Sequence, residues 1–344
     1  MTFAAARRRP EPTFSILDAL GDPKLFGGLA AFRDLATWSA WIVFLRAAYG
    51  LPLEADQLET FRRHTGRAVY DPPPGGFPEV VCVVGRQSGK TRIAATIAAF
   101  EAVLAERESD RTELYALLVA QDHRAALRAL FGYVRAPFEN IPVLHRSVSE
   151  MRADTLRLQS GVTLAAYPCR PAAVRGLRAK VAVVDELAFF TATDGRPQDV
   201  EMLRALRPAL ATTGGKLVIL SSPYAQTGAL WELHRRHYGR DDSTTLVWQA
   251  TAPDMNPSLP SDYLERMRDD DPEAYRSEVL GEFRSGVSTF FDAEALDACV
   301  VPERRELAPV ASPRTGRSTT GRSSSATRLP SPRCSTGCCT TGTC

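Results

Sequence analysis

Four nearly continuous apolar runs divide the middle of the chain: VVCVV at 80–84, LYALLVA at 114–120, VAVV at 181–184 and LVIL at 217–220. Runs without polar alternation are typical of strands buried on both faces, as in parallel sheets covered by helices. Segments of helical character lie between them, at 90–107, 123–135 and 199–210. The alternation of the two kinds of segment predicts an α/β fold with a mainly parallel sheet flanked by helices.

Helical periodicity precedes the first of these runs. Apolar side chains recur at intervals of three and four, which predicts one helix over 32–49. A second, shorter helix is expected over 54–64, ending at Gly66. The segment DPPPGGFP at 71–78 then interrupts regular structure and marks the entrance to a new structural unit.

Two further elements are predicted from local signals. The segment TLRLQSGVTLAAYP at 155–168 has the pattern of a β-hairpin that turns at its SG dipeptide. The segment DPEAYRSEVLGEF at 271–283 predicts a late helix, with Asp271 as its cap and Pro272 at its first position. No internal repeat is visible in the sequence.

The composition is that of a protein with a sizeable core and no membrane span. The 344 residues are 44% hydrophobic and 24% charged. The longest apolar stretch, AWIVFL at 40–45, is far shorter than the roughly 18 residues that a span needs. The N-terminus has three arginines but no apolar region behind them, so no secretory signal is expected. Scattered cysteines at 82, 169 and 299 fit a reducing compartment, and the cytoplasm is the expected location.

The formal net charge of +2 hides two unlike parts of the chain. The segment 312–344 holds five arginines and no acidic residue, which leaves a net charge of −3 on the first 311 residues. The body is therefore not expected to be a strongly basic nucleic-acid binder. The tail is poor in apolar residues and is expected to be disordered. A zinc site from its four cysteines and a basic nucleic-acid tail are the alternatives, but CxxxCCxxxxC lacks the CxxC pairs of structural zinc.

A phosphate-binding loop is the first candidate for chemistry. GRQSGKT follows an apolar run and opens a helical segment, where backbone N–H groups and the helix dipole can hold phosphate oxygens. The usual pattern G-x-x-x-x-G-K-[ST] would place its first glycine at position 84, which is Val84, so the glycine comes one residue late. Taken alone, the string also fits a lysine at an ordinary strand-to-helix turn. The residues expected to bind ATP are Gly85, Arg86, Gln87, Ser88, Gly89, Lys90 and Thr91.

Within this loop two side chains have separate expected roles. Lys90 would contact the β and γ phosphates, and the Thr91 hydroxyl would bind Mg²⁺.

In KVAVVDEL at 180–187, Asp185 and Glu186 end a buried strand, the place where open α/β sheets bind ligands. We expect Asp185 to hold Mg²⁺ and Glu186 to orient or deprotonate the attacking water. The alternative is a solvated pair that caps a helix.

The third apolar strand of the site ends in Ser221, Ser222 and Pro223. Hydroxyl groups at this position can sense the γ-phosphate and pass its loss to a moving element, which makes the three residues candidates for coupling. The other interpretation of the segment is an ordinary helix start.

Arginines near the loop are candidates for a residue of the same chain whose positive charge stabilises the transition state. Arg86 lies inside the loop, and Arg175 or Arg178 precedes the strand that carries the Asp-Glu pair. Each could instead be an ordinary surface charge. The candidate catalytic residues are therefore Glu186, Lys90, Arg86 and Arg175.

GRQSGKT closely resembles the modified phosphate-binding motif of the large terminase subunits of tailed bacteriophages, in which Arg and Gln follow a small residue and the usual first glycine is absent. The VVDE and SSP segments are similar to two further motifs of this family. Similarity to prophage-type members extends through 32–53 and 61–67, and through SSPYAQTGALWELHRRHYG and LVWQATAPDMNPSL. It covers about residues 26–310.

The resemblance implies a P-loop NTPase of the ASCE type that couples ATP hydrolysis to translocation of double-stranded DNA into a procapsid. It implies ATP and Mg²⁺ as cofactors, and double-stranded DNA, the phage portal, the small terminase subunit and further copies of the chain as partners. The location would be the cytoplasm of a bacterial host, at the procapsid. Gln57 is a candidate for contact with adenine, and Arg235, Arg236 and Arg240 are candidates for contact with DNA.

The resemblance also implies a division of the chain, with a small helical lid built from two separate segments. The expected parts are a disordered N-terminus at 1–13, the first part of the lid at 14–70, the ATPase core at 71–250, a linker and lid segment at 251–300, and a disordered tail at 301–344.

Large terminases carry a C-terminal RNase H-like nuclease, and here the sequence departs from the family. No strand of the D-P-S-G-G type follows RRELAPV. We expect the tail to result from a frameshift or premature end of the gene, so that the nuclease half is missing and no endonuclease activity belongs to this chain. The alternatives to a packaging motor are a non-packaging prophage remnant and a helicase-like DNA-dependent ATPase.

Overall fold

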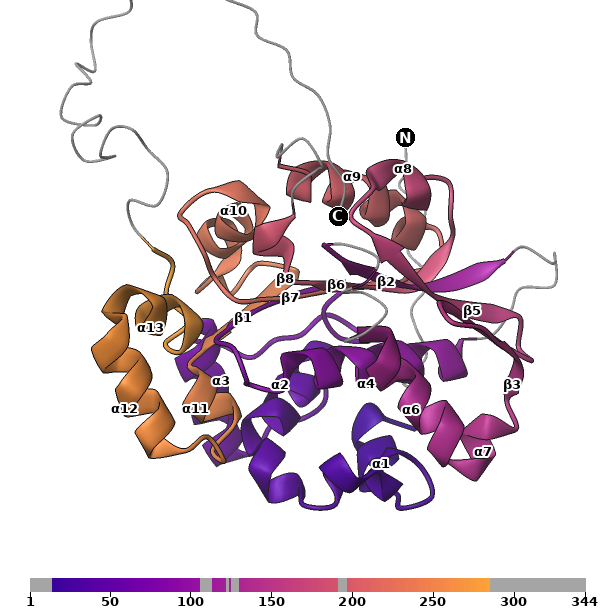
Figure 1. Cartoon of the computed structure of the whole chain (residues 1–344), viewed down its shortest axis with the longest axis horizontal. Helices are drawn as coiled ribbons and strands as arrows, with labels where there is room; N and C mark the ends of the chain where they lie inside the picture. The colour runs from indigo at the N-terminus through magenta and orange to yellow at the C-terminus, as the bar shows by residue number, and fades with distance from the viewer. Residues whose placement is uncertain (1–13, 106–112, 122–123, 125–129, 191–196, 285–344) are drawn as a thin grey trace, which may run out of the picture. The chain divides into compact units, whose positions relative to one another are not determined.

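The structure, a computed structural model, describes residues 14–105, 113–121, 124, 130–190 and 197–284 (Figure 1). The expectations for 1–13, for 285–300 and for the tail at 301–344 fall outside the described residues, as do residues 123 and 125–129 of the helix predicted over 123–135. None of the described helices is long and apolar enough to cross a membrane.

Eight strands form one sheet in the described residues. They are β1 (Glu79–Val84), β2 (Leu114–Ala120), β3 (Val148–Met151), β4 (Thr155–Leu158), β5 (Val162–Pro168), β6 (Ala179–Asp185), β7 (Lys216–Ser221) and β8 (Thr245–Ala250). Their order is β3-β4-β5-β2-β6-β7-β1-β8. All neighbours from β5 to β8 pair in parallel, and β4 pairs antiparallel with β3 and β5. The predicted α/β fold with a mainly parallel sheet is confirmed.

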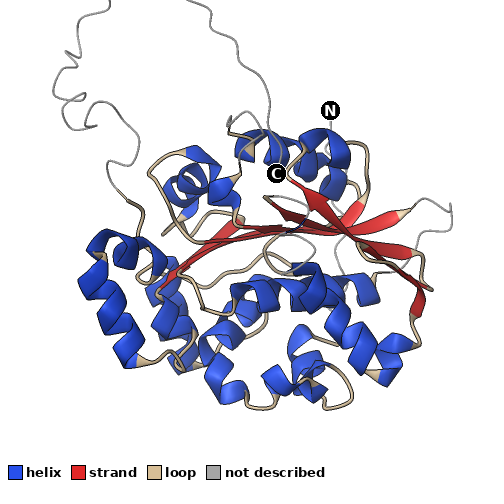
Figure 2. Ribbon diagram, viewed as in Figure 1, coloured by secondary structure: helices blue, strands red, loops and turns tan. Residues whose placement is uncertain are grey.

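Helices cover both faces of this sheet (Figure 2). The first half of the described chain contributes α1 (Ile16–Gly21), η1 (Phe26–Gly28), η2 (Ala30–Phe32), η3 (Leu35–Trp38), α2 (Ser39–Tyr49), α3 (Ala55–Thr65), α4 (Lys90–Leu104), α6 (Gly132–Asn140) and α7 (Pro142–His145). The second half contributes α8 (Pro171–Val174), η5 (Leu187–Phe189), α9 (Asp199–Ala211), α10 (Gly228–His237), α11 (Ala252–Met255), α12 (Ser261–Asp270) and α13 (Pro272–Glu278).

Two apolar clusters lie on opposite faces of the strands. One joins α1, α2, α4 and α6 to the sheet, and the other joins α8, α9 and α10 to it (Figure 1). Because strand side chains alternate between faces, successive β1 residues serve different clusters: Val80 packs in the first and Val81 in the second. Each central strand is thus buried on both faces, which explains the continuous apolar runs.

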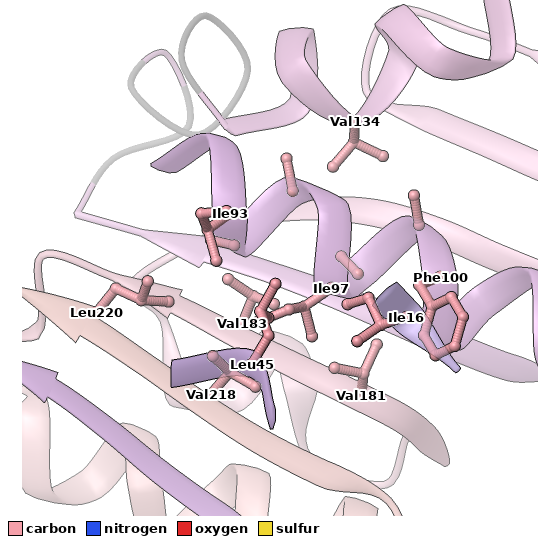
Figure 3. Close-up of a cluster of buried hydrophobic side chains, with 14 of the residues drawn as sticks. Ile16, Leu45, Ile93, Ile97, Phe100, Val134, Val181, Val183, Val218 and Leu220 are labelled. Carbon is pink, nitrogen blue, oxygen red and sulfur yellow. The ribbon is translucent and has the colours of Figure 1, made fainter. Parts of the chain in front are cut away.

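Helix α4 is the best-buried helix of the first cluster. Ile93, Ile97 and Phe100 project from it toward the β-strands, among Val181 and Val183 of β6 (Figure 3). The alanines between them have no long side chain, so the helix lies close to its neighbours on every side. This packing fixes the start of α4, and therefore Lys90, relative to the sheet.

Several predicted elements differ from the structure in extent. The helix predicted over 32–49 is wrong in its first part, because the Asp34 carboxylate accepts a hydrogen bond from Ala36 N and starts the separate turn η3; the α-helix begins only at Ser39. The hairpin over 155–168 is confirmed, as is the cap of α13 by Asp271. The edge strands β3 and β8 were not predicted.

Lys216 holds the first part of the predicted lid against the sheet. Its side chain lies at the start of β7 and is 2% exposed. Its ammonium donates hydrogen bonds to the carbonyl oxygens of Ala48 (3.0 Å) and Phe77 (2.6 Å) and lies 4.8 Å from the ring centroid of Tyr49. Ala48 belongs to the last turn of α2, where free carbonyls favour a cation.

Replacing this lysine should destabilise the fold. We expect Lys216→Met to lower the free energy of unfolding by roughly 2–4 kcal/mol, because two buried carbonyl groups lose their donor. Urea denaturation measures the change. Arg266→Met on the exposed surface of α12 is the control and should shift stability by less than about 0.5 kcal/mol. Equal effects of the two substitutions would contradict the role of Lys216.

His64 joins α3 to β8. The side chain is 4% exposed, its Nδ1 lies 3.1 Å from the carbonyl oxygen of Gln249, and its ring lies 4.9 Å from that of Trp248. Burial lowers the pKa of His64. Because the pKa in the folded state is depressed, this residue contributes stability that is present above the unfolded pKa and is lost as the pH falls through the folded pKa.

The fold should therefore weaken in acid partly through His64. We expect the free energy of unfolding of the wild type to fall between about pH 7.5 and about pH 5, and His64→Gln to flatten part of this slope. Urea melts across this pH range measure it. The exposed His145→Gln is the control. A slope unchanged in His64→Gln would show that the buried imidazole does not supply it.

Candidate functional site

The loop between β1 and α4 is shaped for an anion. Gln87 has φ 62° and Gly89 has φ 90°, so two left-handed residues flank Ser88. Alternation of this kind turns successive backbone N–H groups toward one concave side. The first N–H groups of α4 also lack partners within the helix, and its dipole places partial positive charge there. Lys90 is the first residue of this helix.

The late glycine of the loop has a packing reason. A Cβ atom at Gly85 would lie 2.5 Å from the carbonyl oxygen of Glu278 and 2.7 Å from that of Val279. Arg86 N donates a hydrogen bond of 2.6 Å to the carbonyl oxygen of Glu278. The backbone at the end of α13 therefore passes directly against position 85, where only glycine leaves room.

Lys90 connects the loop to the ends of two strands. The side chain is 6% exposed. Its ammonium lies 2.9 Å from Glu186 Oε1, directly after β6, and donates a 2.9 Å hydrogen bond to Ser222 Oγ, directly after β7. Three residues that are far apart in sequence thus meet at the carboxyl ends of adjacent strands.

Asp185 lies beside this group and is almost fully buried. Thr91 Oγ1 donates a 3.2 Å hydrogen bond to Asp185 Oδ2. Burial, and to a lesser degree the neighbouring Glu186 carboxylate, raises the pKa of Asp185 to about 7. Asp185 Oδ1 and the hydroxyl of Ser88 are both buried and have no hydrogen-bond partner among the described residues. Buried polar atoms without partners are unusual and are typical of sites that receive a ligand.

Glu186 has a strained backbone that is held from the next strand. Its φ is 60°, a conformation that non-glycine residues adopt at a cost of about 1–2 kcal/mol. Glu186 N donates to the carbonyl oxygen of Leu220 (2.8 Å), and Ser222 N donates to Glu186 Oε2 (3.0 Å). Ser221 Oγ accepts a hydrogen bond from Ala188 N at 3.2 Å, and Pro223 is buried directly after this pair. The two segments are therefore one hydrogen-bonded unit.

A cavity of about 820 Å³ opens over these groups. This volume lies in the range of small-molecule sites. Besides residues 86–92 and Glu186, its walls come from segments far away in sequence, including Thr37, Trp38, Tyr133 and Asn256. Gly85, Asp185, Ser221, Ser222 and Pro223 support the site without lining this cavity.

The oxygens at Thr91 and Asp185 fit a Mg²⁺ site that further ligands would complete. Mg²⁺ is usually held by one or two carboxylates together with waters and substrate phosphates. Asp185 supplies one oxygen without a partner, and the Thr91 hydroxyl lies next to the other. In the described part of the chain no cluster of three or more His, Cys, Asp or Glu could hold a metal ion without further ligands.

Two of the sequence candidates lie away from the cavity. Arg175 forms a 3.3 Å ion pair with Glu201 of α9, among the helices on the face opposite α4, so the structure does not bring it to Lys90. Gln57 closes the capping box of α3 and lines a different cavity. By contrast, Arg86 lines the cavity and pairs with Glu278 at 3.4 Å.

Residues that the sequence did not single out surround the loop. Trp41 Nε1 donates a 2.7 Å hydrogen bond to the carbonyl oxygen of Ser88, and Asn256 Nδ2 donates one of 2.7 Å to that of Gln87. Trp38 covers Gly89. In the sequence, Trp38 belongs to an apolar helix face and Trp41 to the apolar stretch 40–45, and no local pattern distinguishes Asn256 from a turn residue, so only the fold brings them to the site.

No protein-family model and no curated protein matches the sequence. Three solved structures illustrate the fold comparison. The large terminase ATPase domain of Thermus phage P74-26 is 18% identical, with 70% of this chain and 98% of that chain covered and a TM-score of 0.49. A large terminase from a thermophilic bacteriophage is 14% identical, with 60% of this chain and 48% of that chain covered and a TM-score of 0.44. The HK97 bacteriophage large terminase is 18% identical, with 76% and 58% covered and a TM-score of 0.50.

Of these three likenesses, the one to the HK97 protein reaches a TM-score of 0.50, and at 18% identity it establishes the fold alone. Over the part that is covered, the chain has the fold of the HK97 bacteriophage large terminase. It spans 58% of the length of the HK97 chain and 48% of the large terminase from the thermophilic bacteriophage.

The structure allows a test of how much room there is for a side chain at Gly89, with Gly176 as the matched control. Gly89 and Gly176 both have positive φ, at 90° and 83°, but a Cβ at Gly89 would lie 2.9 Å from Trp38 whereas one at Gly176 meets nothing within 4 Å. We expect Gly176→Ala to lower the free energy of unfolding by about 1 kcal/mol and Gly89→Ala to lower it by at least about 1 kcal/mol more. Urea denaturation compares the two, and equal losses would contradict the close contact with Trp38.

Proposed function

We propose that this chain is the ATPase motor of a phage large terminase subunit, which couples ATP hydrolysis to translocation of double-stranded DNA into a procapsid. The observation that carries the proposal is the meeting of Lys90 with Glu186 at 2.9 Å and of Thr91 with Asp185 at 3.2 Å, beside a cavity that Lys90, Thr91 and Glu186 line. These pairs place a phosphate-binding loop opposite two carboxylates, the arrangement that phosphoryl transfer needs.

The loop residues 85–91 would bind the phosphates of ATP. The residues at the start of α4, including Lys90, line the same cavity, so their N–H groups and the ammonium could hold the β and γ phosphates together. The Thr91 hydroxyl and Asp185 Oδ1 would hold Mg²⁺, whose chemistry when bound is to neutralise phosphate charge. Arg86 lines the same wall and supplies a further positive charge from within the loop.

Glu186 is the proposed general base, because its carboxylate faces the cavity beside Lys90. The carboxylate lies 2.9 Å from the ammonium and neutralises its charge. A bound triphosphate would compete for the ammonium of Lys90, and Glu186 would then be available to orient a water molecule and accept its proton.

Ser221, Ser222 and Pro223 are the proposed coupling segment. Ser222 contacts both Lys90 and Glu186, so loss of the γ-phosphate would change its partners. The chain directly after it is hydrogen-bonded to a distant segment: Arg284 N donates to the carbonyl oxygen of Tyr224 (2.7 Å), and Gln226 N donates to that of Arg284 (3.3 Å). A rearrangement at Ser222 could therefore be transmitted through these hydrogen bonds to the residues that follow α13.

The remaining partners belong to the same proposal. The motor would act as a homo-oligomer at the phage portal, together with the small terminase subunit, in the cytoplasm of a bacterial host. Arg235 and Arg236 are exposed on α10, where both pair with Glu232, and Arg240 is exposed just beyond it. These arginines are the proposed contacts for the DNA backbone.

Two substitutions separate nucleotide binding from hydrolysis. We expect Lys90→Ala to abolish ATP hydrolysis and to weaken ATP binding, because the phosphates lose their buried cation. Glu186→Gln should keep ATP binding and lower kcat by at least about 100-fold, because the general base is lost. Steady-state ATPase assays and calorimetric binding of ATP measure both, with and without double-stranded DNA.

The controls are the exposed variants Lys24→Ala and Glu265→Gln, which should behave like the wild type. Stimulation of hydrolysis by double-stranded DNA is expected for a translocating motor. A wild-type chain that neither binds nor hydrolyses ATP would overturn the assignment. Hydrolysis that DNA leaves unchanged would contradict the coupling to translocation.

A further inference from the structure

Two side chains from outside the loop hold two successive peptide units of the loop. Asn256, after α11, donates to the carbonyl oxygen of Gln87 at 2.7 Å, and Trp41, in α2, donates to the carbonyl oxygen of Ser88 at 2.7 Å. The donors come from segments near opposite ends of the described chain. Together they fix the direction of both carbonyl groups.

Fixing a carbonyl group also fixes the following N–H group. A trans peptide unit is planar, and its C=O and N–H bonds point in opposite directions. Because the Gln87 and Ser88 carbonyls point to Asn256 and Trp41, the N–H groups of Ser88 and Gly89 point the other way. Neither N–H group donates a hydrogen bond to another described residue. Both residues line the cavity.

The loop conformation needs such support. Gln87 has φ 62°, which costs a non-glycine residue about 1–2 kcal/mol and persists only where the surroundings enforce it. Trp41 is fully buried, and its ring packs edge-on against Phe44 with centroids 5.3 Å apart, so its N–H direction is fixed. Asn256 is fixed in turn, because its Oδ1 accepts a hydrogen bond from Ser258 N at 3.2 Å.

We propose that Trp41 and Asn256 are positioning residues that aim the N–H groups of Ser88 and Gly89 at the pyrophosphate part of a bound nucleoside di- or triphosphate. The inference rests on the proposed function, since it names residues that build the same phosphate site. It assigns the two residues a role in binding rather than in the chemical step. The diphosphate group recognised is common to ADP, ATP and inorganic pyrophosphate.

The test uses Trp41→Phe, which keeps the buried ring and removes the donor, and Asn256→Ala. Calorimetry measures the Kd of the full chain for ADP and for inorganic pyrophosphate. We expect each variant to weaken both ligands by roughly 5- to 30-fold, because oriented N–H groups interact strongly with phosphate oxygens. The KM for ATP should rise by the same factor with kcat changed less than about 2-fold, since these contacts are equal in the ground and transition states.

Matched controls lie elsewhere in the chain. Trp231→Phe alters a partly buried tryptophan that packs on Phe283, and Asn140→Ala removes an amide that donates to the carbonyl oxygen of Ala136 at 2.8 Å. Both should leave the Kd values unchanged. Urea denaturation of all variants separates stability from binding.

The outcomes distinguish this inference from the function on which it rests. If Trp41→Phe and Asn256→Ala bind ADP and pyrophosphate as tightly as the wild type, the positioning role is overturned, even if their urea midpoints are lower. The proposed function would not be affected by that result. A loss of kcat at unchanged KM would also overturn it, because the residues would then act in the chemical step. A wild-type chain that binds neither ADP nor pyrophosphate would overturn the proposed function, and this inference with it.

Discussion

The buried ammonium group of Lys90 has a carboxylate beside it, and the site is organised around this ion pair. Lys90 is 6% exposed, and within the described residues its charge is balanced by Glu186 at 2.9 Å. Leaving such a charge without a partner costs several kcal/mol, so the lysine and the glutamate stay together until another anion enters. A phosphate is the anion that the shape of the loop suits. Under the proposed function, an anion bound at Lys90 would compete with Glu186 for the ammonium.

The sheet order makes this contact possible. β1 and β6 are not neighbours; β7 lies between them and pairs in parallel with both. Their carboxyl ends therefore lie in a row, with Lys90 reaching from the helix after β1 across Ser222 to the Glu186 that follows β6. Ligands bind at this edge of open α/β sheets because loops from adjacent strands converge there. The buried packing of α4 holds the lysine end of the row in place.

Much of this arrangement could be predicted from the sequence, because its signals are local. Continuous apolar runs identified β1, β2, β6 and β7, and the chemistry-bearing residues of the site follow the carboxyl ends of β1, β6 and β7. The contacts that shape the loop are not local. Trp41 has the pattern of a core residue, and Asn256 that of a turn, so their hydrogen bonds to the loop depend on how α2 and α11 pack. The opposite holds for Arg175. It is close to β6 in sequence, which made it a candidate for the site, but in the structure it pairs with Glu201 instead of lying near the cavity.

The segment from Glu278 to Arg284 connects two parts of the site that would otherwise be independent. At its start, the carbonyl oxygen of Glu278 accepts the N–H of Arg86 at 2.6 Å, and at its end Arg284 forms a bridge with Ala225. In the middle, Gln249 Nε2 donates to the carbonyl oxygen of Gly281 at 2.6 Å. Hydrogen bonds at both ends mean that the loop and the residues after Ser222 cannot move apart without breaking backbone contacts to the same short segment. A change of partners at Ser222 is therefore mechanically connected to the phosphate loop through the backbone as well as through Lys90.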